Sequence, residues 1–217
     1  MKNCIVLIFL FCSFLGFCQK FSESERSYLS KLEKILKVDT IPFYNQEIRV
    51  YKKSGITTGL ELFRIYYDEQ KKDYKADFYY TIAKKSSNDS HEIIIKHFEL
   101  KSFYNTEYIA LQLLTSNIKY LPSDEAIRYK MKPKPKITLD IGGYFSYPKT
   151  YGMTVVDGVG YYVQVKDGKD FNEIHYSNPE RYLEHYPNID EYISINEFLD
   201  IIKKSFNIFE DYKKLYP

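Results

Sequence analysis

Cysteine is absent from most of this sequence. The chain of 217 residues has three cysteines, Cys4, Cys12 and Cys18, and all of them lie within the first 18 residues. Residues 19–217 can therefore offer no cysteine nucleophile, no thiolate ligand for zinc and no disulfide. A domain made of these residues must be held together by its hydrophobic core, which is feasible at this length.

An excess of charge of one sign is also lacking. The chain has 31 basic and 29 acidic residues. This balance argues against nucleic-acid binding and against a polybasic membrane clamp as the main role. After Phe17, no apolar run approaches the ~20 residues that a membrane-spanning helix requires. The sequence thus predicts no nucleic-acid partner and no transmembrane span beyond the first 18 residues.

Several catalytic and cofactor motifs are missing as well. No G-x-S-x-G elbow, Walker lysine loop or H-E-x-x-H motif occurs. Gly158-Val159-Gly160 begins like a dinucleotide fingerprint, but Val163 stands at the third glycine position. None of the four histidines has a second histidine two to four residues away. The sequence therefore predicts neither a cofactor nor a metal site.

Residues 1–18, called the leader below, have the three parts of a secretory signal peptide. Lys2 gives a positive start, residues 5–17 are largely apolar, and the small residues Gly16 and Cys18 precede Gln19. We expect the leader to be removed during export, so that residues 19–217 act in the periplasm or outside the cell. A buried N-terminal helix is the alternative.

Three helices are predicted from capping signals and apolar periodicity, over residues 21–37, over residues 106–117 and from residue 194 onward. Ser22 with Glu25, and Ser194 with Glu197, have the spacing of capping boxes. Asn105 is placed to cap the middle helix. A short helix is also expected between Pro122 and residue 130.

Alternating apolar and polar residues predict strands between these helices. The predicted strands are 47–53, 60–68, 74–83, 91–100, 137–141, 161–166 and 171–176. Asp157-Gly158 and Asp167-Gly168 have the composition of hairpin turns, and Asn178-Pro179 should end the last strand. Because strands follow strands without βαβ alternation, the predicted fold class is α+β, with a mostly antiparallel sheet in two meanders packed with an N-terminal, a middle and a C-terminal helix.

Residues 130–136, KMKPKPK, are the one strong shift in composition after the leader. Two prolines among four lysines favour an extended, solvated segment. The segment would connect either two halves of a single domain or two subdomains within residues 19–217, and the sequence leaves both open.

Tyrosine is abundant, with 23 residues against no tryptophan. The candidate ligand-binding residues are Tyr144, Tyr147, Tyr162, Tyr176 and Asn178. Exposed tyrosine rings beside an amide could stack on a sugar or bind a peptide. The first hypothesis is therefore a non-enzymatic binding or interaction module that uses an aromatic β surface to contact a glycan, a peptide or an envelope protein. Alternatively, these rings pack against the helices.

A histidine near several carboxylates gives the second hypothesis, a hydrolase. His175 would act with Asp157 or Asp167, which requires these groups to lie within hydrogen-bond reach in one cleft. The sequence leaves enzymatic activity open and leans against it. The third hypothesis is a structural or envelope-assembly protein, which would expose a large apolar patch.

Three stretches resemble small exported proteins of unknown function from Bacteroidetes-type bacteria. They are DG-x-x-YYV at 157–163, HYSNPERY at 175–182 and SINEFLDII at 194–202. The end of the leader, Phe-Cys-Gln, is similar to leaders from the same group. The resemblance covers residues 150–206 and the leader, and it implies export from a Gram-negative cell without identifying catalytic residues. Lipidation of Cys18 is less favoured, because lipoprotein signals need a small residue where this chain has Phe17.

Overall fold

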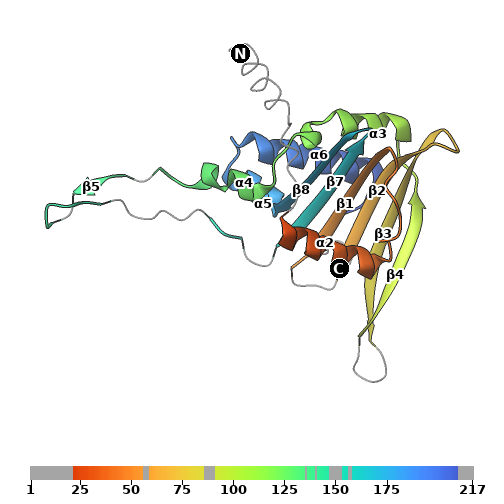
Figure 1. The fold of residues 1–217 in the computed structure, drawn as a ribbon, viewed down its shortest axis with the longest axis horizontal. Helices are drawn as coiled ribbons and strands as arrows, with labels where there is room; N and C mark the ends of the chain where they lie inside the picture. Colours follow the sequence, from red (N-terminus) through yellow and green to blue (C-terminus); the bar gives the residue numbers. More distant parts are fainter. Residues whose placement is uncertain are drawn as a thin grey trace, which may run out of the picture.

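An antiparallel sheet packed with helices forms the structure, which is a computed structural model (Figure 1). It describes residues 22–55, 59–85, 91–134, 136–139, 141–146, 153–155 and 158–209. The main strands are β1 (Gln46–Ser54), β2 (Leu60–Asp68), β3 (Asp73–Lys85), β4 (His91–Leu100), β7 (Val159–Asp167) and β8 (Asp170–Ser177). The longer helices are α2 (Glu23–Leu36), α3 (Thr106–Thr115) and α6 (Asp190–Phe206). Shorter elements are η1 (Asn117–Lys119), α4 (Asp124–Ile127), η2 (Arg128–Met131), β5 (Thr138–Leu139), β6 (Phe145–Ser146) and α5 (Pro179–His185).

The six main strands form one sheet in the order β4-β3-β2-β1-β7-β8, and every neighbouring pair is antiparallel. Strands β1 to β4 make a meander, and β7 with β8 makes a hairpin. Pairing of β1 with β7 joins the two, so strands from both sides of residues 130–136 share one sheet. The predicted α+β class with a mostly antiparallel sheet is confirmed.

Local signals place two of the helices. The hydroxyl of Ser22 accepts a hydrogen bond from the backbone N–H of Glu25, whose carboxylate accepts one from the Ser22 N–H at 2.9 Å. The predicted capping box of α2 is therefore confirmed. Asn105 Oδ1 accepts a hydrogen bond from the Tyr108 N–H at 3.0 Å and begins α3 as predicted.

The predicted capping box of the C-terminal helix is wrong. Helix α6 begins at Asp190, so Ser194 lies inside it. Asp190 and Glu191 occupy the first turn, where carboxylates interact favourably with the positive end of the helix dipole. Tyr192 and Ile195 begin the buried face of α6, and the apolar period therefore starts before the predicted cap.

Gly158 does not occupy the predicted hairpin turn. It directly precedes β7, and residues 153–155 before it form no strand. A Cβ atom at Gly158 would lie 1.4 Å from Asn178 Oδ1, so the position requires glycine. The second predicted turn does form, because Gly168 joins β7 to β8 with a φ of 64°.

Both faces of the sheet are covered. Alternate residues of a strand point to opposite faces, and two hydrophobic clusters result. Val50 and Val163 belong to the cluster that includes α3 and α6, whereas Tyr51 and Tyr162 belong to the cluster formed with α2. Figure 1 shows α2 in front of the sheet and α6 behind it.

Candidate functional site

The predicted ligand-binding tyrosines of β7 and β8 lie in the core. Tyr162 is 9% exposed and faces α2, while Tyr176 is 0% exposed on the opposite face. The Tyr176 ring packs edge-on against Tyr192, and its hydroxyl donates to the Pro122 carbonyl oxygen at 2.7 Å. Burial raises the pKa of both hydroxyls. Neither ring presents a face on which a ligand could stack.

Asn178 also has a structural position. It is buried and adopts the left-handed conformation, with a φ of 50°. Its Oδ1 accepts a hydrogen bond from the Val159 N–H at 2.7 Å, and its backbone carbonyl accepts one from Tyr182. The side chain thus fixes the start of β7 beside the start of α5.

Tyr144 is the predicted binding residue that the structure places on the surface. It is 74% exposed, and the adjacent Phe145 is 77% exposed. Both belong to the β5–β6 hairpin, which extends away from the main sheet (Figure 1). Tyr147, predicted beside them, lies outside the described residues. The structure therefore separates Tyr144 from Tyr162, Tyr176 and Asn178.

The β5–β6 hairpin is amphipathic. Leu139 pairs with Phe145, and Thr138 pairs with Ser146 on the other face. Ile137, Leu139 and Ile141 are all more than 60% exposed. An isolated two-stranded hairpin is marginally stable in water. An apolar hairpin face that the described core does not cover is therefore a candidate contact surface.

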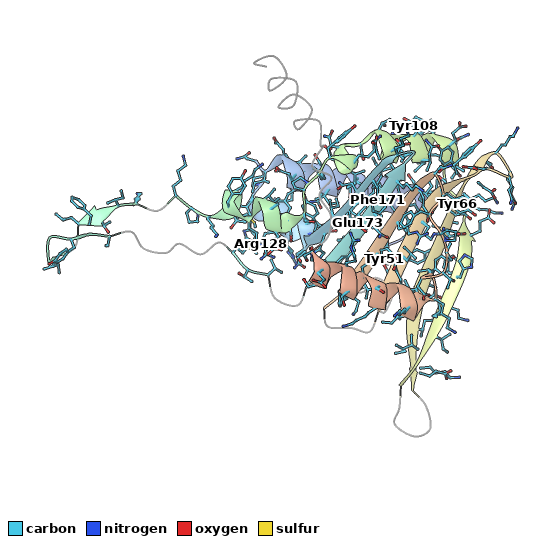
Figure 2. The ribbon with its side chains drawn as sticks, in the orientation of Figure 1. Tyr51, Tyr66, Tyr108, Arg128, Phe171 and Glu173 are labelled. Atoms are coloured by element: carbon cyan, nitrogen blue, oxygen red, sulfur yellow. The ribbon has the colours of Figure 1, made fainter. Side chains whose placement is uncertain are left out.

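A second group of exposed apolar side chains lies on the outer surface of α3. Tyr108 is labelled there in Figure 2 and is 58% exposed, and Leu111, on the next turn, is 45% exposed. Phe103 and Tyr104, just before the helix, are also exposed. The helical periodicity of apolar residues predicts the buried face of α3. Tyr108 and Leu111 are apolar residues that do not belong to that face, and this was the signal in the sequence for an exposed apolar surface.

His175 lies close to carboxylates, but they are not the predicted ones. Its Nδ1 lies 3.6 Å from Glu25 Oε1, and its ring stacks on Tyr162 with the centroids 4.1 Å apart. Tyr162 stands opposite His175 across the β7–β8 pair. Asp167 lies five residues further along β7, roughly 17 Å away at the usual rise per residue.

Asp167 and His175 are therefore not brought together. The Asp167 carboxylate accepts a hydrogen bond from Lys119 Nζ at 2.7 Å, and this contact lowers its pKa. Asp157, the other predicted partner, lies outside the described residues. The proposed pairing of His175 with Asp167 in one cleft does not form.

Asp124 is the second carboxylate near His175. Its Oδ2 accepts a hydrogen bond from the Ser177 N–H at 3.0 Å, and the neighbouring Ser123 hydroxyl accepts one from the His175 N–H at 3.1 Å. Burial raises the pKa of Asp124 and lowers that of His175, and the charge of each group opposes the shift of the other. Both shifts favour the uncharged forms of the two groups.

The cluster of His175, Glu25 and Asp124 holds α2 and α4 against the end of β8. Within the described part of the chain, neither imidazole nitrogen hydrogen-bonds to a side-chain hydroxyl, as activation of a serine or threonine nucleophile would require. Sequence reasoning missed both carboxylates because they are far from His175 in the chain. Glu25 was identified in the sequence, but only as a member of the capping box with Ser22.

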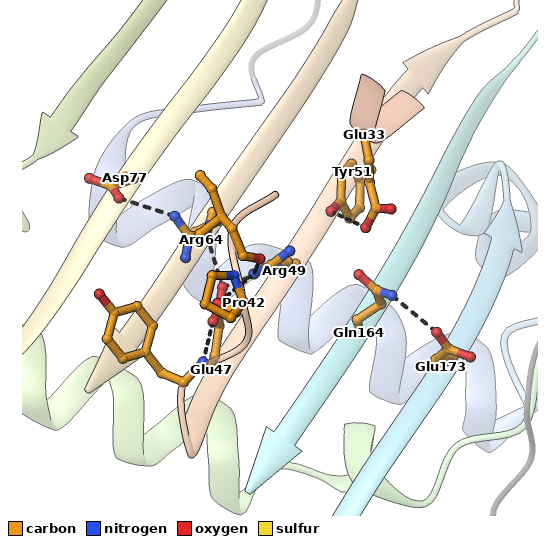
Figure 3. Close-up of polar contacts among 11 residues, drawn as sticks. Glu33, Pro42, Glu47, Arg49, Tyr51, Arg64, Asp77, Gln164 and Glu173 are labelled. Atoms are coloured by element: carbon orange, nitrogen blue, oxygen red, sulfur yellow. Dashed lines mark hydrogen bonds and ion pairs between the residues drawn. The ribbon is translucent and has the colours of Figure 1, made fainter. Parts of the chain in front are cut away.

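A buried row of polar side chains crosses the α2 face of the sheet (Figure 3). In strand order its members are Glu99, Asp77, Arg64, Arg49, Gln164 and Glu173. All except Glu99 are buried. We call these six residues the polar row.

Glu47, beside the row, forms ion pairs with both of its arginines. Glu47 is 1% exposed, and its Oε1 accepts hydrogen bonds from Arg49 Nε at 2.7 Å and from Arg64 Nε at 2.9 Å. Its Oε2 accepts from the Tyr44 N–H at 2.8 Å. Arg49 also donates to the carbonyl oxygen of Ile41 at 2.8 Å, so the loop after α2 closes over the row.

Neighbouring groups complete the row. Arg64 Nη1 lies 3.6 Å from Asp77, and Gln164 donates to Glu173 at 3.0 Å. Glu173 also accepts from Arg26 of α2 at 2.9 Å. Since the charged groups of the row pair with one another and with Arg26 and Glu47, we assign the row a structural role, in which it links neighbouring strands and α2.

Comparison with known protein families, curated proteins and solved structures finds no match to this chain. Among the described residues, no group of three or more histidines and carboxylates is placed to hold a metal ion. No described helix combines the length and the hydropathy needed to cross a membrane.

Proposed function

We propose that this chain is a non-enzymatic interaction protein of the cell envelope, exported through its leader, that binds a partner protein through the β5–β6 hairpin. The observation that carries this proposal is the exposed apolar face of that hairpin. Ile137, Leu139 and Phe145 stand in water, where burial against a partner would be favourable at about 25 cal/mol per Å² of apolar surface.

Charge around the hairpin describes the surface that it would contact. Lys132, Lys134 and Lys136 precede β5 and are exposed. A partner with an apolar patch bordered by carboxylates would complement both the hairpin face and these lysines. The overall charge balance of the chain does not show this local excess.

Site-specific photocrosslinking in the producing cells tests the proposal. A photoreactive amino acid at position 139 or 145 should give one discrete crosslinked product, because these residues share the apolar face. The same amino acid at Thr138 or Ser146 is the matched control on the other face of the hairpin. Replacing Lys132, Lys134 and Lys136 by glutamate should reduce the product at 139 and 145.

Equal crosslinking from both hairpin faces, or none from either, would contradict this function. Binding of the purified chain to vesicles containing anionic phosphatidylglycerol, without any protein partner, would instead assign the hairpin to lipid. Loss of a hydrolytic activity in the variant His175→Gln would support the alternative of a hydrolase.

A further inference from the structure

The two edges of the main sheet differ in whether another segment of the chain covers them. On the β8 edge, the backbone N–H groups of His175 and Ser177 donate to the side chains of Ser123 and Asp124. The side chain of Asn172 donates to backbone carbonyls of the segment before α4. The segment that ends in α4 therefore covers this edge and prevents another strand from pairing there.

The β4 edge is open. Within the described ranges, no segment makes a backbone hydrogen bond to the outer side of His91–Leu100. The strand is 10 residues long and contains Ile93, Ile94 and Ile95 in succession. Ile93 is 46% exposed and Phe98 is 43% exposed. A long edge strand with exposed apolar side chains and an unpaired outer side is a template for strand pairing.

We propose that β4 pairs with β4 of a second copy of this chain, which joins two six-stranded sheets into one continuous antiparallel sheet. A two-fold axis perpendicular to the sheet makes identical edge strands antiparallel and places one residue opposite itself. We place the axis at Ile94.

The charges on β4 select this position. With the axis at Ile94, Glu92 of each copy stands opposite Lys96 of the other, which gives two ion pairs on one face of the sheet. Ile93 stands opposite Ile95 of the other copy on the second face, giving two apolar pairs. Cross-strand pairs of both kinds stabilise a sheet.

Two other positions of the axis, at Ile95 and at Lys96, are worse. An axis at Lys96 places the two Lys96 ammonium groups opposite each other, which is destabilising. An axis at Ile95 places Ile94 opposite Lys96, and Glu92 opposite Phe98. Of these three arrangements, only the axis at Ile94 matches opposite charges and apolar side chains together.

The shape of the molecule leaves room for this contact. Figure 1 shows the isoleucine-rich beginning of β4 extending, together with the end of β3, beyond α2 and the rest of the sheet. A second copy paired around Ile94 therefore meets this projecting ribbon. The pairing would also cover part of Ile93, which the monomer leaves exposed.

Cysteine crosslinking tests the axis. The full chain carrying Cys4→Ser, Cys12→Ser and Cys18→Ser has no thiol, so Ile94→Cys introduces a single one. Two copies of residue 94 should lie about 5 Å apart and form a disulfide-linked dimer on mild oxidation. Two copies of residue 96 would be displaced by four residues, about 13 Å along the strands, so Lys96→Cys should not crosslink.

Charge reversal tests the same pairing without crosslinks. Glu92→Lys or Lys96→Glu should raise the dimer dissociation constant roughly tenfold, and the combined exchange should restore it. Analytical ultracentrifugation measures the dissociation constant, and both residues are exposed, so each variant should fold. A chain that stays monomeric, a dimer unaffected by either single reversal, or faster crosslinking at 96 than at 94 would overturn the proposal.

Discussion

The substitution Glu47→Gln tests the buried polar row most directly. It keeps the size and shape of the side chain but removes the negative charge that faces Arg49 and Arg64. The glutamate oxygen that accepts from both guanidinium groups lies 2.7 and 2.9 Å from their Nε atoms. After the change, Arg64 keeps only Asp77, at 3.6 Å, and Arg49 loses the carboxylate that accepts its Nε hydrogen bond.

Removing one member of a buried ion pair typically costs about 3–5 kcal/mol, because the remaining charge stays buried without compensation. We expect a loss of this size in the free energy of unfolding. In urea, it would lower the unfolding midpoint by roughly 1–2 M for a protein of this size. Far-UV circular dichroism should follow the transition, since the chain has no tryptophan.

Glu99→Gln is the matched control. Glu99 belongs to the same row, opposite Asp77, but its side chain is 64% exposed and its partner is Lys75. The control should leave the unfolding midpoint almost unchanged. If Glu47→Gln unfolds at the same midpoint as the natural chain, the carboxylate does not compensate the buried arginines and the assigned role of the row is wrong.

Two further predictions concern His175 and Gly158. Burial lowers the folded-state pKa of His175 below its ordinary value of 6.5. As the pH falls, the unfolded chain therefore binds the proton before the folded chain does. The contribution of His175 to the free energy of unfolding is fully present above about pH 6.5 and is lost at lower pH. Urea midpoints measured between about pH 5 and pH 7.5 should show this loss, and His175→Gln should remove it; an unchanged pH profile would argue against a buried neutral imidazole. Gly158→Ala should destabilise the fold by about 1–3 kcal/mol, because its Cβ must displace the Asn178 side chain. In the background of Asn178→Ala, the same change should cost much less in urea denaturation, and equal costs in both backgrounds would contradict the steric explanation.

Local sequence patterns predicted most of the elements of this fold. Alternation located β1 within one residue of its observed ends, and the capping signals of Ser22 and Asn105 located two helices. These signals are short-range and involve neighbouring residues. The pairing of β1 with β7 has no such signal, because the two strands are separated by more than half of the described chain.

Gly158 shows how a local signal can have another cause. Asp-Gly is typical of a hairpin turn, and the sequence prediction used that association. In the structure, the glycine leaves space for a side chain that lies twenty residues later, Asn178. Only the tertiary contact distinguishes these two reasons for a glycine.

The prediction of a ligand-binding surface on β7 and β8 was wrong because both faces of the sheet are covered there. In the register of the β7–β8 pair, Tyr176 stands opposite Tyr161 rather than Tyr162, so Tyr162 and Tyr176 face opposite sides of the sheet. The prediction of exposed rings required one side to remain in water. Helix α2 covers the side of Tyr162, and α6 covers the side of Tyr176, so both rings are buried.

The polar row also shows that alternation along one strand does not reveal which faces of a sheet are buried. On β1, Glu47 and Arg49 alternate with Ile48 and Val50, which is the usual pattern of a strand with one face in water. The pattern records only that two faces differ in polarity. Burial of the polar face is possible because Glu47 accepts hydrogen bonds from Arg49 and from Arg64 on the next strand, and because the loop after α2 supplies carbonyl acceptors. Charge matching across strands decides whether a polar face is solvated or enclosed, and that matching depends on strand register rather than on any one strand.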